Sequence, residues 1–153
     1  MVLLTIVPST SACSKREENW SCERQDEIVD ALRKDDVWSK VRGAGTDLGD
    51  YSESPCTGDE ASITYGQRFR TEGQLSMADV QEWGQRLTQG TPWQLKTTSS
   101  RDEGAADAAH VCYSSSIGRD PTYLRLHSVP DAAPEPNLYV ELTVATPNVE
   151  VCV

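Results

Sequence analysis

Residues 138–145 read Leu-Tyr-Val-Glu-Leu-Thr-Val-Ala, and this stretch does most to decide the fold class. Apolar and more polar side chains alternate along it. Such alternation predicts a β-strand with one buried face, because successive side chains of a strand point to opposite sides of the sheet. Residues 123–129, Tyr-Leu-Arg-Leu-His-Ser-Val, alternate in the same way. We therefore expect two well-formed strands near the C-terminal end of the chain.

Weaker alternation predicts further strands, over residues 61–70, 93–97 and 109–114. The first of them places apolar side chains on one side and Ser, Thr and Arg side chains on the other, as in a half-buried strand. Turn-forming residues predict connecting loops over residues 43–55, 99–107 and 129–136.

Two helices are predicted from charge placement and capping residues. The first spans residues 22–34, with acidic side chains near its start and basic ones near its end, which complements the helix dipole. The second follows Ser76, which has Asp79 three positions on in an N-cap arrangement, and it ends at Gly90. Residues 37–41 fit either a short strand or a further helical turn.

This order of elements predicts an α+β fold. The helix-strand-strand-helix-strand order, followed by a run of strands, favours a two-layer sandwich in which two helices cover one face of a mainly antiparallel sheet. A ferredoxin-like or related plait is the nearest architecture. The other face of the sheet, rich in Thr, Arg and Glu, is expected to lie in solvent. Residues 22–153 would form this single globular domain.

Composition and charge restrict the class of protein. The chain has 153 residues, room for one domain, and its four tryptophans argue against disorder. The formal net charge of −10 repels phosphate backbones, so we expect no nucleic-acid partner. No stretch of about 18 apolar residues is present to form a membrane-spanning helix.

Five cysteines stand at positions 13, 22, 56, 112 and 152. The last four have no CxxC or Cys/His spacing typical of zinc sites, so two disulfides are the better interpretation. Three connectivities are possible for four cysteines. We favour Cys22–Cys56 and Cys112–Cys152, because each of these pairs would join neighbouring elements.

The remaining cysteine follows a short apolar leader. Residues 1–12 end in Thr10-Ser11-Ala12, directly before Cys13. Small residues between an apolar run and a cysteine resemble the signal of the small cell-envelope lipoproteins of actinomycete-type bacteria. The resemblance implies a signal peptide over residues 1–12 that is removed, a lipid on Cys13 and a tether over residues 13–21. Because the apolar run is short and no basic residue precedes it, the true start of this signal peptide would lie upstream. The alternative is a first strand over residues 2–7, with Cys13 as an ordinary thiol.

Candidate catalytic residues are few. Ser114, Ser115 and Ser116 lie near His110 and Asp107 in the sequence, so a serine-hydrolase triad is one hypothesis. His110 and His127 lie on separate predicted strands. If these strands are neighbours, the two imidazoles could bind a metal or titrate together, although a surface or hydrogen-bonding role is more common.

The acidic segment with Asp47, Asp50, Glu53, Asp59 and Glu60 is a weak candidate for calcium, which prefers oxygen ligands on flexible loops. It lacks the EF-hand spacing. No cofactor-binding fingerprint is present, so we expect no cofactor.

Taken together, these features predict a non-enzymatic binding or interaction module, anchored by lipid to the extracytoplasmic face of the cell membrane. Its partner would be an envelope protein or a small ligand. The alternatives are an extracytoplasmic serine hydrolase and a soluble secreted protein.

Overall fold

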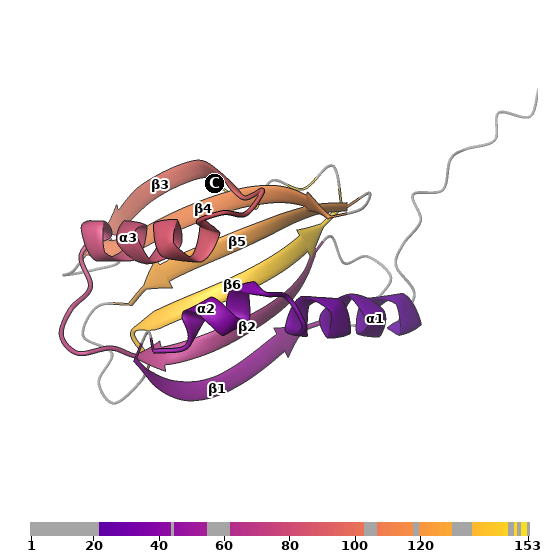
Figure 1. The fold of residues 1–153 in the computed structure, drawn as a ribbon, viewed down its shortest axis with the longest axis horizontal. Coiled ribbons are helices and arrows are strands. Elements are labelled where there is room, and N and C mark those ends of the chain that lie inside the picture. The colour runs from indigo at the N-terminus through magenta and orange to yellow at the C-terminus, as the bar shows by residue number, and fades with distance from the viewer. Residues whose placement is uncertain are drawn as a thin grey trace, which may run out of the picture.

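The computed structural model describes residues 22–43, 45–54, 62–102, 107–117, 120–129, 136–146, 149 and 151–152. Within these residues the chain forms one antiparallel sheet with helices packed against one of its faces (Figure 1). The coarse prediction of an α+β fold with an antiparallel sheet is therefore confirmed.

The helices are α1 (Cys22–Arg33), α2 (Val37–Val41) and α3 (Met77–Thr88). The predicted bounds of α1 and α3 are close to these, and residues 37–41 form the additional helical turn. The N-cap predicted at the start of α3 is present and forms a capping box. The side chain of Ser76 accepts a hydrogen bond from the backbone N–H of Asp79, and the Asp79 carboxylate accepts one from the backbone N–H of Ser76. Gly90, at a φ of 73°, follows the end of this helix.

Polar contacts tie the helices to one another. The indole N–H of Trp38 on α2 donates to the carbonyl of Leu32 on α1, at 2.6 Å. The Nζ of Lys40 donates to the carbonyls of Leu87 and Gln89, at 3.3 and 3.1 Å. Because these two carbonyls lie at the C-terminal end of α3, the lysine satisfies acceptors that the helix itself leaves unpaired.

The six strands are β1 (Thr46–Glu53), β2 (Ser62–Arg70), β3 (Gln94–Asp102), β4 (Asp107–Ile117), β5 (Asp120–Ser128) and β6 (Leu138–Ala145). Their order across the sheet is β1-β2-β6-β5-β4-β3. The last strand in sequence, β6, therefore lies in the middle of the sheet, between β2 and β5. Its bounds are those predicted from the alternation of residues 138–145.

The hydrophobic core lies between the helices and the sheet. Every second residue of β6 is an apolar residue that contributes to it, and Leu142 faces Tyr65 on β2 and Leu124 on β5 across the sheet. From the helices come Ile28, Leu32, Trp38, Val80 and Leu87. The apolar side chains that recur along the helices with a period of 3.6 residues and along the strands with a period of two therefore pack into one core.

Two predictions about loops are corrected. Residues 46–53, expected within a loop, form the edge strand β1, and β3 and β4 extend into the region expected to be a loop over residues 99–107. Most side chains of β1 are exposed, so the strand has no apolar alternation to signal it. A shift of register between Asp47 and Asp50, typical of a β-bulge, accommodates the turn-forming residues there.

The ferredoxin-like plait is not confirmed, nor is the finer assignment to a two-layer sandwich with two helices. A ferredoxin-like plait has the order β-α-β-β-α-β, with two helices that connect strands. Here two helices precede the first described strand, and among the described elements only α3 lies between two strands. The described helices number three rather than the expected two.

The second face of the sheet, opposite the helices, is named here the open face. We expected its Thr, Arg and Glu side chains to lie in solvent, and this is wrong at its centre. Thr64, Thr143 and Glu141 are only 4%, 2% and 7% exposed. The hydroxyls of Thr64 and Thr143 lie 2.9 Å apart and form a cross-strand hydrogen bond.

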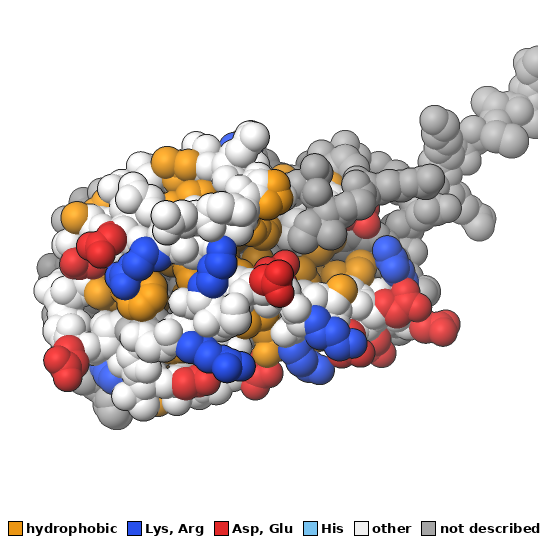
Figure 2. Space-filling view, viewed as in Figure 1, with side chains coloured by type: hydrophobic (Ala, Val, Ile, Leu, Met, Phe, Trp, Pro, Cys, Tyr) orange, Lys and Arg blue, Asp and Glu red, His pale blue; other side chains and the backbone are white. Residues whose placement is uncertain are grey.

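The helical face carries charges of both signs. Figure 2, viewed from this side, shows acidic and basic side chains interspersed over the described surface, with acidic ones gathered over α1. No helix among the described residues is long and apolar enough to cross a membrane.

Candidate functional site

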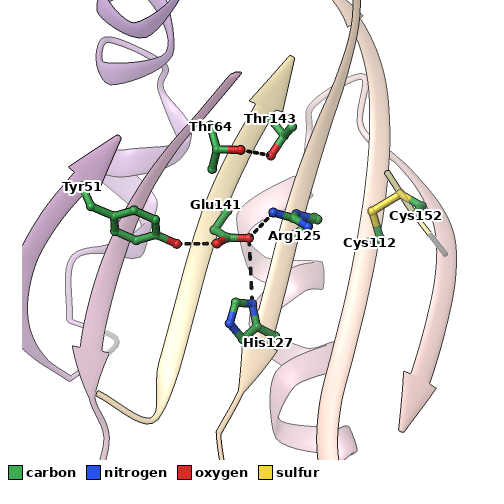
Figure 3. Close-up of polar contacts among 8 residues, drawn as sticks. All are labelled: Tyr51, Thr64, Cys112, Arg125, His127, Glu141, Thr143 and Cys152. Atoms are coloured by element: carbon green, nitrogen blue, oxygen red, sulfur yellow. Dashed lines mark hydrogen bonds and ion pairs between the residues drawn. A yellow bond between two sulfur atoms is a disulfide. The ribbon is translucent and has the colours of Figure 1, made fainter. Parts of the chain in front are cut away.

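The candidate site is a cluster of polar side chains on the open face, centred on Glu141 of β6 (Figure 3). Strand register brings its members together. Glu141 is paired with Gly66 on β2 and with Arg125 on β5, and Arg125 is paired with Cys112 on β4. Directly paired residues of antiparallel strands share a face, so this row runs across the middle of the sheet.

Glu141 receives three contacts. The phenol O–H of Tyr51 donates to its Oε1, and the Nη2 of Arg125 lies 2.6 Å from its Oε2. The Nδ1 of His127 lies 3.9 Å from the same oxygen. The glutamate side chain is only 10% exposed, whereas those of Arg125 and His127 are 28% and 32% exposed. The cluster therefore has a buried carboxylate at its centre and partly accessible cationic or titratable groups around it.

Gly66 allows Tyr51 to reach this carboxylate. A Cβ atom at residue 66 would lie 2.6 Å from the Cζ of the Tyr51 ring and 2.8 Å from its hydroxyl oxygen. The ring of Tyr51, on the edge strand β1, thus lies across the backbone of β2 and contacts Glu141 one strand further on. Glycine at this position is explained by close approach rather than by backbone conformation.

We expect Gly66→Ala to lower the free energy of unfolding by about 1–3 kcal/mol, because the added methyl group must displace the Tyr51 ring. Chemical denaturation measures this. In a Tyr51→Ala background the same change should be neutral or stabilising, since alanine costs less conformational entropy than glycine in a strand. Equal destabilisation in both backgrounds would show that the ring does not occupy this space.

Burial raises the pKa of Tyr51 well above its ordinary value of 10.0, and the negative charge of Glu141 and the hydrogen bond to it act in the same direction. Burial is also the largest cause of the raised pKa values of Tyr65 and Tyr113. All three phenols therefore hold their protons more tightly in the folded state than in the unfolded chain.

An alkaline loss of stability follows from these shifts. A raised pKa in the folded state contributes stability that is fully present below the unfolded value of 10.0 and is lost as the pH rises above it. We expect the free energy of unfolding to fall above this pH. In Tyr51→Phe the fall should be shallower, with the remainder due to Tyr65 and Tyr113. Urea denaturation on both sides of the unfolded value measures it, and identical slopes in the two proteins would contradict the assignment.

A second row of side chains lies beside the first. Arg68, Tyr139, His127 and His110 are paired in that order across β2, β6, β5 and β4. The rings of Tyr139 and His127 stack with their centroids 4.6 Å apart and an interplanar angle of 6°. Those of His127 and His110 lie 6.4 Å apart, edge to face. The two strands that carry the histidines are therefore neighbours, which is the condition under which the two imidazoles could act together.

The predicted disulfide between Cys112 and Cys152 is present. Cys112 is fully buried, and its partner brings the C-terminal end of the chain against the open face beside Arg125 (Figure 3). The predicted pairing of Cys22 with Cys56 and the predicted lipidation of Cys13 lie outside the residues whose side chains the structure describes.

Those residues of the hypothetical serine triad whose side chains the structure describes do not lie close together. Ser114 and His110 lie on β4, four positions apart, which separates them by about 13 Å at the rise of a β-strand. Ser115 alternates onto the other face of the strand. The side chains of Ser116 and Asp107 are outside the description.

The calcium candidates do not form one site either. Asp50 is paired with Gln67 and Glu53 with Thr64, so the two carboxylates lie on opposite faces of β1. Asp50 instead accepts a hydrogen bond from the O–H of Tyr65, at 2.9 Å. Asp59 and Glu60 are outside the described residues. Among those that are described, no group of three or more His, Cys, Asp or Glu side chains is placed to hold a metal ion.

Tyr51, Arg125, Tyr139 and Glu141 were not among the candidate site residues predicted from the sequence. One signal for Glu141 was available, because it is the single charged residue within the apolar alternation of β6. Comparisons with protein families, with curated proteins and with solved structures found no match to this chain.

Proposed function

We propose that this chain is a lipid-anchored protein of the extracytoplasmic face of the cell membrane, and that its domain is a non-enzymatic binding module. The open face, with the cluster around Glu141, is the proposed binding surface. An envelope protein or a small ligand is the proposed partner.

The observation that carries the extracytoplasmic placement is the disulfide between Cys112 and Cys152. Disulfides form and persist in oxidising compartments outside the cytosol and are rare within it. The lipid anchor is supported by the sequence alone, through Ser11-Ala12-Cys13 and the charged tether that follows. A diacylglyceryl group carries two acyl chains, which suffices for stable attachment to a bilayer.

The binding role is supported by the chemistry of the open face. Three partly exposed side chains lie there: Arg125 in the row of Glu141, and His127 and Tyr139 in the row beside it. They offer a cation, a titratable ring and an aromatic surface to a partner. Arginine and tyrosine are enriched in protein interfaces. The buried carboxylate of Glu141 holds Arg125 in place, so a partner would meet an arranged surface rather than free side chains.

Membrane fractionation tests the anchor. The wild-type protein should sediment with membranes and incorporate labelled palmitate, whereas Cys13→Ser should be released and unlabelled. Ser14→Ala, one residue away, is the matched control and should behave as the wild type. Retention of Cys13→Ser in the membrane would overturn the anchor, and an unmodified N-terminus found by mass spectrometry would favour the soluble secreted alternative.

A fluorophosphonate probe tests the hydrolase alternative. We expect no covalent labelling of the purified protein, because Ser114 is too far along β4 from His110 for the imidazole to remove its proton. Labelling at residues 114–116 that is lost in His110→Ala would overturn the non-enzymatic assignment.

A further inference from the structure

His110 and His127 are the two histidines of this chain, and they face each other directly across β4 and β5. Both rings are on the open face and partly exposed. Two imidazoles at directly paired positions of an antiparallel sheet have side chains close enough to act on one small ligand.

The environment of His127 orients its ring. The Nδ1 of His127 faces the Glu141 carboxylate at 3.9 Å, and the Tyr139 ring stacks on it with an interplanar angle of 6°. With Nδ1 directed at the carboxylate, Nε2 points away from Glu141. At 3.9 Å this contact is an ion pair rather than a hydrogen bond. A shorter contact would give the carboxylate–histidine arrangement that orients many metal-binding imidazoles.

The separation of the rings can be compared with that in a metal site. With a metal–nitrogen bond of about 2.0–2.1 Å and tetrahedral geometry, the centroids of two coordinating imidazoles lie about 5 Å apart. The rings of His110 and His127 lie 6.4 Å apart. Coordination would therefore require the rings to approach each other by about 1 Å for a tetrahedral ion, or about 2 Å for the tetragonal geometry of Cu²⁺. It would also require changes of side-chain rotamer that turn one nitrogen of each ring toward the ion.

We infer that His110 and His127 form a chelating pair for a divalent transition-metal ion, with Glu141 as the residue that positions His127. The two imidazoles supply the protein ligands, and water completes the coordination. Imidazole nitrogen suits Cu²⁺, Ni²⁺ and Zn²⁺, and the order of divalent affinities places Cu²⁺ above the other two. Ca²⁺ and Mg²⁺, which prefer oxygen ligands, should not bind here. The inference goes beyond the proposed binding role and is independent of the anchor at Cys13.

Titration of the full chain with Cu²⁺, followed by calorimetry and electron paramagnetic resonance, tests the pair. We expect one bound ion per chain with two nitrogen donors, tighter binding of Cu²⁺ than of Ni²⁺ or Zn²⁺, and no heat with Ca²⁺. His110→Ala and His127→Ala should each abolish this binding. Ser99→Ala, at the position paired with His110 on β3, is the matched control and should bind as the wild type.

The positioning role of Glu141 has its own readout. Glu141→Gln should weaken Cu²⁺ binding by about 10–100-fold while both nitrogen donors remain in the spectrum. Thermal unfolding of every variant verifies that the domain is folded at the temperature of the titration. Absence of wild-type binding, or unchanged binding in both histidine variants, would overturn the inference. Unchanged affinity in a folded Glu141→Gln variant would overturn the role of the carboxylate.

Discussion

Replacement of both Cys112 and Cys152 by alanine is expected to lower the free energy of unfolding by about 4 kcal/mol. The disulfide closes a loop with a sequence separation of 40, and on the chain-entropy account most of this loss comes from the greater freedom of the unfolded chain. A domain of this size has a total stability of about 5–15 kcal/mol, so the loss is a large part of it. Urea denaturation of the wild type and the double variant measures the difference.

Two comparisons separate the effect of losing the disulfide bond from the effect of replacing the cysteine side chains. The double variant has no cysteine at these two positions, so its stability should respond less to a reducing agent than that of the wild type. The single variant Cys152→Ala, which leaves a buried thiol at Cys112, should resemble the double variant in stability. A double variant as stable as the oxidised wild type would show that the cross-link contributes nothing to the free energy of unfolding.

Much of this fold could be predicted from local patterns. Residues 138–145 form the strand that their alternation predicts, and Ser76 with Asp79 begins a helix as its capping pattern predicts. Both structures are predictable because they depend on residues close together in the sequence. A strand follows from the two-residue alternation of its side chains, and a helix start follows from its capping residues. The edge strand β1 could not be predicted in this way. Most of its side chains are exposed, so its sequence does not alternate between apolar and polar residues.

The candidate site could be predicted only in part, for a reason of topology. His110 and His127 lie on strands that are consecutive in sequence and paired in space, so their proximity could be stated as a condition. Glu141 contacts Tyr51 and Arg125 only because β6 enters the sheet between β2 and β5. Local sequence patterns do not specify this insertion of β6. The approach of Tyr51 also requires Gly66, and a glycine in a strand does not by itself indicate which side chain approaches it.

Glu141→Leu is expected to destabilise the domain by about 3 kcal/mol. The change removes the partner of Arg125 and the acceptor of the Tyr51 hydroxyl. Removal of one member of a buried ion pair leaves the other charge without compensation, which typically costs about 3–5 kcal/mol. Arg125 is 28% exposed and can recover some hydration, so the expected loss is at the lower end of this range.

The second step of this experiment separates the unpaired charge from the other contacts of Glu141. The double variant Glu141→Leu/Arg125→Leu should be more stable than Glu141→Leu alone, because apolar replacement of a whole buried pair is often neutral or stabilising. Glu27→Ala, in the exposed pair with Arg24 on α1, is the control and should change stability by no more than about 0.5 kcal/mol. If the double variant is instead less stable than Glu141→Leu, the arginine stabilises the sheet through its packing, and the pair is not the source of the loss.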